Sequence, residues 1–249
     1  MIAERSKWLI CRKRRPGSVR LFCFPHSGGY AGEYARWSDS LPDVELHAVQ
    51  LPGRGSRVGE STFTRMQPLV DALMAEIEFR APFALFGHSK GSLVAYELAR
   101  ALRDRGPAQP ILLFASGSRA PHLARRTELV SHLPDEELLA AVERWYGAVP
   151  EEVRADPELA ALVTAGLRAD LAIVEAYRYL PAEPLDCPIV ATGGLDDDVT
   201  KDELEAWSRH TRAGFDLDLF PGGHFYLREQ SEPLLRVIAD ALRRQLGGQ

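Results

Sequence analysis

Strand-like and helix-like segments alternate along most of this 249-residue sequence, and this alternation constrains the fold more than any other feature. Short apolar runs predict strands at 19–24, 44–50, 83–86, 111–115, 189–192 and 215–220. Apolar residues spaced three and four apart predict helices at 66–79, 92–103, 203–210 and 234–246. This alternation is typical of a mostly parallel sheet with helices on both faces. We therefore predict an α/β fold.

One region, residues 118–180, breaks the alternation. It contains no good strand pattern, only helical patterns at 135–145, 151–154 and 157–179. A helical stretch of this length is more than a simple crossover between two strands needs. We predict a core formed by 1–117 and 181–249, with 118–180 inserted over the edge of the sheet as a helical lid.

Charge, hydropathy and cysteine content exclude several classes of protein. The net charge of −5 argues against general nucleic-acid binding. No apolar stretch approaches the roughly 18 residues that span a bilayer, and the run Trp8–Cys11 is too short for the core of a signal peptide. Cys11, Cys23 and Cys187 lie far apart and form neither a CxxC pair nor a zinc set. We expect a cytoplasmic protein without a metal or membrane, with Cys23 and Cys187 buried.

The segment Gly87-His88-Ser89-Lys90-Gly91 lies between a predicted strand and a predicted helix. It matches the pattern G-x-S-x-G in the context where that pattern holds a nucleophilic serine on a tight, strained turn. Side chains two residues on either side of the serine would clash in such a turn, which explains both glycines. We predict that Ser89 is a nucleophile.

A serine hydroxyl needs a base, and in this arrangement an acid and then a histidine follow the serine along the chain. His224 fits because it follows the last predicted strand in a glycine-rich loop. The acid is expected after the preceding strand, where the sequence offers Asp196, Asp197 and Asp198. One of these would fix the histidine tautomer. Local physical reasoning does not choose among the three aspartates.

The glycine-rich segment Pro25–Gly29 follows the early strand and suits an oxyanion hole. We predict that the backbone N–H groups of Ser27 and Lys90 are its donors, the latter at a helix N-terminus. His26 precedes the serine by many residues, so a structural or substrate-contacting role suits it better than that of the base.

Four motifs follow one another along the chain: Phe24–Gly29, Gln50–Gly55, Phe86–Ser89 and Pro221–Phe225. Together they resemble the type II thioesterases that accompany polyketide synthases and non-ribosomal peptide synthetases, within the α/β-hydrolase superfamily. The segments 167–170, 177–179 and 185–189 are also similar to the family, so the resemblance covers almost the whole chain.

The resemblance implies an α/β-hydrolase fold and cleavage of acyl thioesters from the phosphopantetheine arm of acyl or peptidyl carrier proteins, without a cofactor. It also implies Asp196 as the acid, from its spacing to Val199 and Trp207. The family usually has proline at the next position, where this chain has Asp197, so Asp197 is kept as an alternative. Lys90 is a second departure, since the family usually has methionine or leucine there.

A cation at a helix N-terminus is unfavourable by a few tenths to about 1 kcal/mol. Lys90 should therefore have an acidic partner, or a use in steering an anionic acyl group or the phosphate of the arm. On the lid, Trp145 and Tyr146 belong to an apolar stripe that forms either plain core or an acyl-binding wall. Because carrier proteins are commonly acidic, Arg119, Arg125, Arg126 and the run Arg12–Arg15 are candidates for a docking patch on what we expect to be a monomer.

The same residues fit other functions. An oxoester hydrolase or an acyltransferase would use the same three catalytic groups, since one fold hosts many substrates. A carrier-protein-binding module with a degraded site is a third possibility, against which the intact Ser89, aspartate and His224 argue.

Overall fold

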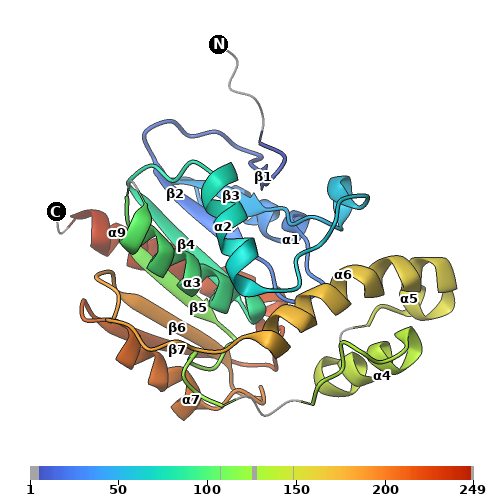
Figure 1. The fold of residues 1–249 in the computed structure, drawn as a ribbon. Helices are drawn as coiled ribbons and strands as arrows, with labels where there is room; N and C mark the ends of the chain where they lie inside the picture. The colour runs from blue at the N-terminus through green and yellow to red at the C-terminus, as the bar shows by residue number, and fades with distance from the viewer. Residues whose placement is uncertain (1–5, 107, 125–127, 148, 248–249) are drawn as a thin grey trace.

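A seven-stranded sheet forms the centre of the protein in a computed structural model, which describes residues 6–106, 108–124, 128–147 and 149–247 (Figure 1). The strand order is β1-β3-β2-β4-β5-β6-β7. The strands are β1 (Leu9–Ile10), β2 (Val19–Phe24), β3 (Val44–Val49), β4 (Phe83–His88), β5 (Leu112–Ser116), β6 (Ile189–Gly194) and β7 (Phe215–Phe220). Only β1 pairs antiparallel; the other neighbours are parallel. The predicted mostly parallel α/β sheet is confirmed.

Helices cover both faces of this sheet. On one face, α2 (Met66–Glu76), α3 (Lys90–Arg105) and α7 (Lys201–Glu205) bury residues such as Leu73, Leu98 and Leu204 against the strands. On the other, α1 (Ala31–Ala35) and α9 (Ser231–Gly247) bury residues such as Tyr34 and Ile238. The central strands β2, β4 and β5 are mostly apolar and are buried along almost their whole length, because both of their faces are covered.

The interval between β5 and β6 holds α4 (Asp135–Tyr146), α5 (Glu151–Ala155) and α6 (Pro157–Ala176). Figure 1 shows these helices grouped to one side of the sheet. We call them the α4–α6 insertion. Asp156 caps α6 by accepting hydrogen bonds from the N–H groups of Glu158 and Leu159, and Pro157 occupies the first turn, where a missing N–H costs little. Part of the insertion has its own small core, formed by Val130, Leu138, Ala141 and Leu167.

Some elements differ from the sequence prediction. Strand β1 and the short helices α1 and α8 (Tyr226–Glu229) were not predicted, because elements of two to five residues carry too little periodicity. The predicted helix 203–210 is instead the α-helix α7 followed by a 3₁₀ helix, Ala206–His210. Cys23 and Cys187 are buried as predicted. Among the described helices, none is long and apolar enough to cross a membrane.

Candidate active site

Ser89 occupies the turn between β4 and α3, with φ 54° and ψ −119°. Among the described residues it is the one non-glycine residue with positive φ, a conformation that costs on the order of 1–3 kcal/mol. A Cβ on Gly87 would overlap the backbone of Gly91, and a Cβ on Gly91 would overlap the backbone of Phe24. The two glycines of the motif are therefore required by close backbone packing, as the sequence predicts.

His224 lies in the loop after β7 and is paired with a carboxylate from the loop after β6. Its Nδ1 lies 2.9 Å from Oδ2 of Asp197, and both side chains are almost completely buried. The expectation that Asp196 holds this imidazole was wrong. Asp197, the alternative that the three-aspartate run left open, makes the contact.

The backbone explains the one-residue difference. The N–H of Leu195 donates to the carbonyl of Phe220 and that of Asp196 donates to the carbonyl of Gly222, so backbone pairing continues past the end of β6. Asp196 takes part in this pairing through its backbone N–H, and the residue is exposed to solvent. The next residue turns inward, where its carboxylate reaches the histidine.

A second, fully buried histidine supports the floor of the site. Nδ1 of His88 lies 2.8 Å from the Ser116 hydroxyl, which in turn lies 2.6 Å from the Tyr226 hydroxyl. Burial lowers the pKa of His88 well below its ordinary value, so its ring is neutral. The ring centroids of His88 and His224 are 5.0 Å apart. This network fixes the His88 ring, against which the ring of the candidate base His224 packs.

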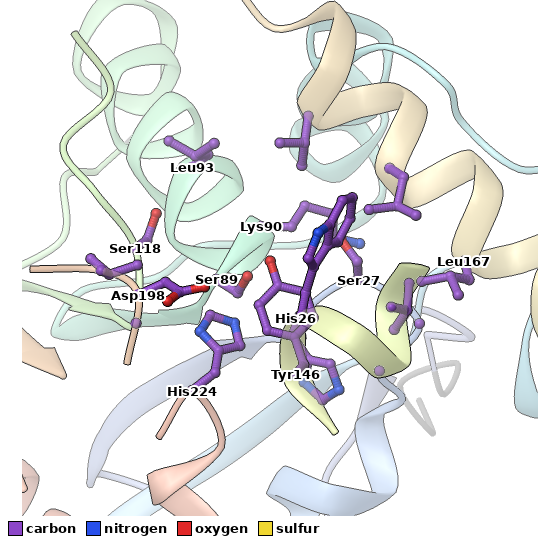
Figure 2. Close-up of a pocket in the computed structure, with 18 of the residues that line it drawn as sticks. His26, Ser27, Ser89, Lys90, Leu93, Ser118, Tyr146, Leu167, Asp198 and His224 are labelled. Atoms are coloured by element: carbon purple, nitrogen blue, oxygen red, sulfur yellow. The ribbon is translucent and has the colours of Figure 1, made fainter. Parts of the chain in front are cut away.

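A pocket of about 1200 Å³ opens above Ser89, between the sheet and the α4–α6 insertion. Every residue predicted for the site except Asp196 lines it: Ser27, His26, Ser89, Lys90, Trp145, Tyr146 and His224, together with Asp197. Figure 2 shows the Ser89 hydroxyl and the His224 ring pointing toward one another inside this pocket.

Tyr146, at the end of α4, stacks on the His224 ring. The ring centroids are 4.5 Å apart and the planes differ by 28°. Burial raises the pKa of Tyr146 to about 12, so the phenol is neutral. The insertion therefore reaches directly to the candidate base, a contact that helical spacing alone does not reveal.

His26 is 7% exposed and its Nδ1 lies 3.4 Å from the Tyr34 hydroxyl. Burial lowers its pKa to about 3, so this ring is neutral and unsuited to act as the base. Its ring fills the space beside Gly29, where a Cβ would overlap it. The geometry fits the structural role better than a role in proton transfer.

The acidic partner expected for Lys90 is Asp170, on α6. Lys90 Nζ lies 2.7 Å from Asp170 Oδ1, and both side chains are sealed from solvent. The ammonium makes no well-directed hydrogen bond within the described residues, so the contact is an ion pair. Arg54 also binds Asp170, with Nη1 at 2.6 Å and Nη2 at 2.9 Å. Because Lys90 Nζ does not face open pocket, its use in steering a ligand is disfavoured.

Asp170 and Arg54 were not singled out from the sequence. They lie in two of the segments that carry the family resemblance, 167–170 and 50–55, and their opposite charges were the available signal for the ion pair.

Away from the pocket, Cys11, Glu45 and His47 form one group of potential metal ligands within the described residues. Glu45 is already bound by His47, by the N–H of Arg15 and by the guanidinium of Arg14, and such a cationic surrounding opposes a metal ion. Of the arginines expected to form a docking patch, Arg119 pairs with Glu203. Arg125 and Arg126 lie outside the described residues.

A family model, sequence relatives and solved structures to which this chain is similar include thioesterases. A family model described as "Thioesterase domain" matches residues 19–242. The chain is 39% identical over 250 residues to linear gramicidin dehydrogenase LgrE of Brevibacillus parabrevis, covering 98% of this chain and 95% of that protein. It is 39% identical over 230 residues to thioesterase PikA5 of Streptomyces venezuelae, covering 90% and 81%.

A solved structure of the type II thioesterase BorB, from the borrelidin biosynthetic cluster, is 39% identical and superposes with a TM-score of 0.85, covering 94% of this chain and 97% of BorB. The overall fold is thus shared with a type II thioesterase over almost the whole of both chains. This chain belongs to the thioesterase family, with the α/β-hydrolase fold.

Proposed function

We propose that this enzyme hydrolyses acyl thioesters on the phosphopantetheine arm of acyl or peptidyl carrier proteins, as an editing or acyl-releasing enzyme of polyketide or non-ribosomal peptide synthesis. The observation that carries the proposal is a strained serine facing a buried His224–Asp197 pair at the floor of a large pocket. The similarity to PikA5 and BorB supports the substrate class.

In the proposed mechanism, Ser89 Oγ attacks the thioester carbonyl while Nε2 of His224 takes its proton. Asp197 holds Nδ1–H of the imidazole, which fixes the tautomer and stabilises the imidazolium. The backbone N–H groups of Ser27 and Lys90 stabilise the tetrahedral oxyanion. The C–S bond then breaks, and His224 returns its proton to the departing thiolate of the arm.

The product of this first half is an acyl-Ser89 ester. A water molecule, deprotonated by His224, attacks the ester carbonyl, and the collapse of the second tetrahedral intermediate releases a free carboxylic acid and restores the serine. Each proton leaves and returns through the same imidazole, so the residues described here suffice for both halves.

The α4–α6 insertion supplies much of the wall that would hold the acyl chain. Apolar side chains from α4 and α6, among them Leu139, Val142, Leu171 and Val174, face the pocket. We propose that the insertion acts as a lid and that Trp145 and Tyr146 contact the acyl group. The partner would be a carrier protein bound by a monomer in the cytoplasm.

The direct test incubates the enzyme with acyl-loaded carrier protein and measures release of free acid and free carrier thiol. Wild type should release both in equal amounts, and Ser89→Ala should release neither above the uncatalysed rate. Full activity of Ser89→Ala, or no hydrolysis by wild type, would refute the proposal. A serine-reactive phosphonate should label wild type at Ser89, which excludes a binding module with a degraded site.

Two alternatives remain for the same site. An oxoester hydrolase would prefer an oxoester over a matched pantetheine thioester, and an acyltransferase would give an ester or amide when an alcohol or amine is supplied. The name of LgrE suggests hydride transfer, but this sequence has no G-x-G-x-x-G segment for a dinucleotide. The Ser89 turn also has no evident use in hydride transfer.

A further inference from the structure

Asp170 accepts contacts from three separate segments that surround Ser89. It lies on α6 and is 1% exposed. Its Oδ2 accepts from the N–H of Gly28 at 2.9 Å and from Nη1 of Arg54, while its Oδ1 accepts from Nη2 of Arg54 and lies beside Lys90 Nζ. Gly28 follows β2, Arg54 follows β3 and Lys90 begins α3.

The pair Asp170–Arg54 binds the backbone of both residues that follow Ser27. While Asp170 accepts from the N–H of Gly28, Nη1 of Arg54 donates to the carbonyl of Gly29 at 3.0 Å. The two consecutive residues that follow Ser27 thus have one backbone donor and one backbone acceptor bound to a single bidentate ion pair. Bidentate arginine–carboxylate pairs add geometric specificity as well as energy.

The local backbone is built for this approach. Gly28 has φ +75°, and a Cβ there would meet Cδ1 of Leu167 on α6 at 3.3 Å. Gly166 brings α6 close to the turn before Arg54, since a Cβ at Gly166 would lie 3.4 Å from the carbonyl oxygen of Gly53. Gln50 donates to the carbonyl of Arg54 at 2.8 Å and fixes the start of that side chain.

The charges of the cluster oppose its rearrangement. Although burial alone would raise it, the cations Lys90 and Arg54 hold the pKa of Asp170 at about 2. The carboxylate is therefore ionised over the working pH range. Removing a buried carboxylate from between two buried cations leaves charge uncompensated, so the cluster does not rearrange at low cost.

From this geometry we propose that Asp170 and Arg54 are positioning residues that fix the oxyanion-binding backbone, making helix α6 a part of the catalytic machinery. The proposal rests on the proposed function, in which Ser27 and Lys90 supply the oxyanion donors. Such donors stabilise a transition state only when they are held in place beforehand, and the loss of one costs about 10²–10³ in kcat. The Asp170–Arg54 pair, which we call the clamp, binds the residues after Ser27 rather than the substrate. Its loss should therefore lower kcat and leave KM nearly unchanged.

The test compares Asp170→Asn and Arg54→Lys with Asp135→Asn as matched control. Asp135 is an insertion carboxylate paired with Arg168, an exposed contact that does not reach the oxyanion segment. Steady-state hydrolysis of hexanoyl-N-acetylcysteamine gives kcat and KM. The inhibition constant of a hexanoyl trifluoromethyl ketone, which forms a tetrahedral adduct on the serine, reports on the oxyanion site directly.

We expect both clamp variants to lose about 10–100-fold in kcat, with KM within about twofold, and to bind the ketone more weakly by a similar factor. Asp135→Asn should stay within about twofold of wild type in all three values. A clamp variant with native circular dichroism that keeps kcat within twofold, or that loses kcat but not ketone affinity, would overturn the proposal.

Arg54→Lys keeps the cation but cannot span the carboxylate and the Gly29 carbonyl, so it decides the question if Asp170→Asn fails to fold. The proposed function is tested separately. If wild type hydrolyses no thioester, that function fails, while ketone affinity still measures the clamp.

Discussion

Two buried carboxylates flank Ser89, and they differ in the part of the protein that carries them. Asp197 follows strand β6 of the sheet core, and its carboxylate lies 2.9 Å from His224. Asp170 belongs to the α4–α6 insertion and holds the side chains of Arg54 and Lys90 and the N–H of Gly28. The first holds the proposed general base, and the second holds the backbone beside the proposed oxyanion donors. In the proposed mechanism, catalytic geometry therefore depends on how the insertion docks as well as on the core.

The largest effect on kcat is expected at Asp197, and it distinguishes this residue from Asp196. Asp197→Asn should lower kcat by about 10⁴-fold, because the histidine would then be held in the wrong tautomer. Asp196→Asn should stay within about twofold, since that residue is exposed and contributes its backbone N–H. Measuring kcat of both variants with hexanoyl-N-acetylcysteamine tests this difference. Equal losses of kcat in the two variants would contradict the assignment of Asp197 as the partner of His224.

The second effect is on stability and concerns Asp170. Asp170→Asn leaves two buried cations without their anion and should lower the free energy of unfolding by about 3–5 kcal/mol. Asp135→Asn breaks an exposed pair and should cost no more than about 1 kcal/mol. Urea unfolding monitored by circular dichroism measures both values. A loss of equal size in the two variants would mean that burial of the cluster is unimportant.

The difference in stability between wild type and Asp170→Asn should depend on pH. The folded pKa of Asp170 is about 2, below the ordinary value of 3.8. The unfolded chain therefore takes up the proton first as pH falls, and stability falls with it. The advantage of wild type over Asp170→Asn should be complete above about pH 4 and should decline toward pH 2. An advantage that is constant over this range would contradict the assignment.

A smaller effect is expected at Tyr146, where the α4–α6 insertion contacts His224. Tyr146→Ala removes the ring stacked on His224, a contact of the kind worth about 0.5–1.5 kcal/mol. We expect kcat/KM to fall by up to about tenfold, the equivalent of about 1.4 kcal/mol. Tyr146→Phe keeps the ring and serves as control, with an expected change within about twofold. A large loss in the phenylalanine variant would instead assign a role to the hydroxyl.

The smallest effect is expected at Lys90. In Lys90→Met, Asp170 keeps Arg54 as a bidentate partner, so kcat should change by no more than about threefold. Burial lowers the pKa of Lys90 to about 8 from 10.5, so between these values the unfolded chain binds more protons and wild-type stability rises with pH. Thermal unfolding at pH 7 and pH 9 should show wild type gaining relative to Lys90→Met. A changed acyl preference in this variant would revive the steering role.

The sequence predicted what depends on local pattern and chain order. Strands β2 and β7 were predicted with their observed bounds, and the clash of side chains at Gly87 and Gly91 followed from the serine turn itself. The acid implied by the resemblance, Asp196, was wrong by one residue, and Asp197 had been kept as the alternative. The choice depended on how far backbone pairing continues beyond Gly194. Periodicity carries no information about that distance.

The contacts of Asp170 could not be predicted in the same way. They join positions 28, 54, 90 and 170, which meet only when α6 packs over the loops that follow β2 and β3. The resemblance marked two of these segments as family motifs without saying that they touch. Helical spacing fixes which face of α6 is apolar, but it does not fix what that face contacts.

If Asp170 positions the oxyanion segment as proposed, it would also give the insertion a role in the timing of cleavage. Helix α6 carries both a wall of the pocket and the carboxylate that holds the Gly28 segment. Any displacement of α6 that widens the entrance for a carrier-bound arm would release that segment at the same moment. An enzyme in that wider state would bind a thioester without cleaving it, and cleavage would begin only when α6 returns. Hydrolysis would then be reserved for acyl groups short or flexible enough to let the helix settle back.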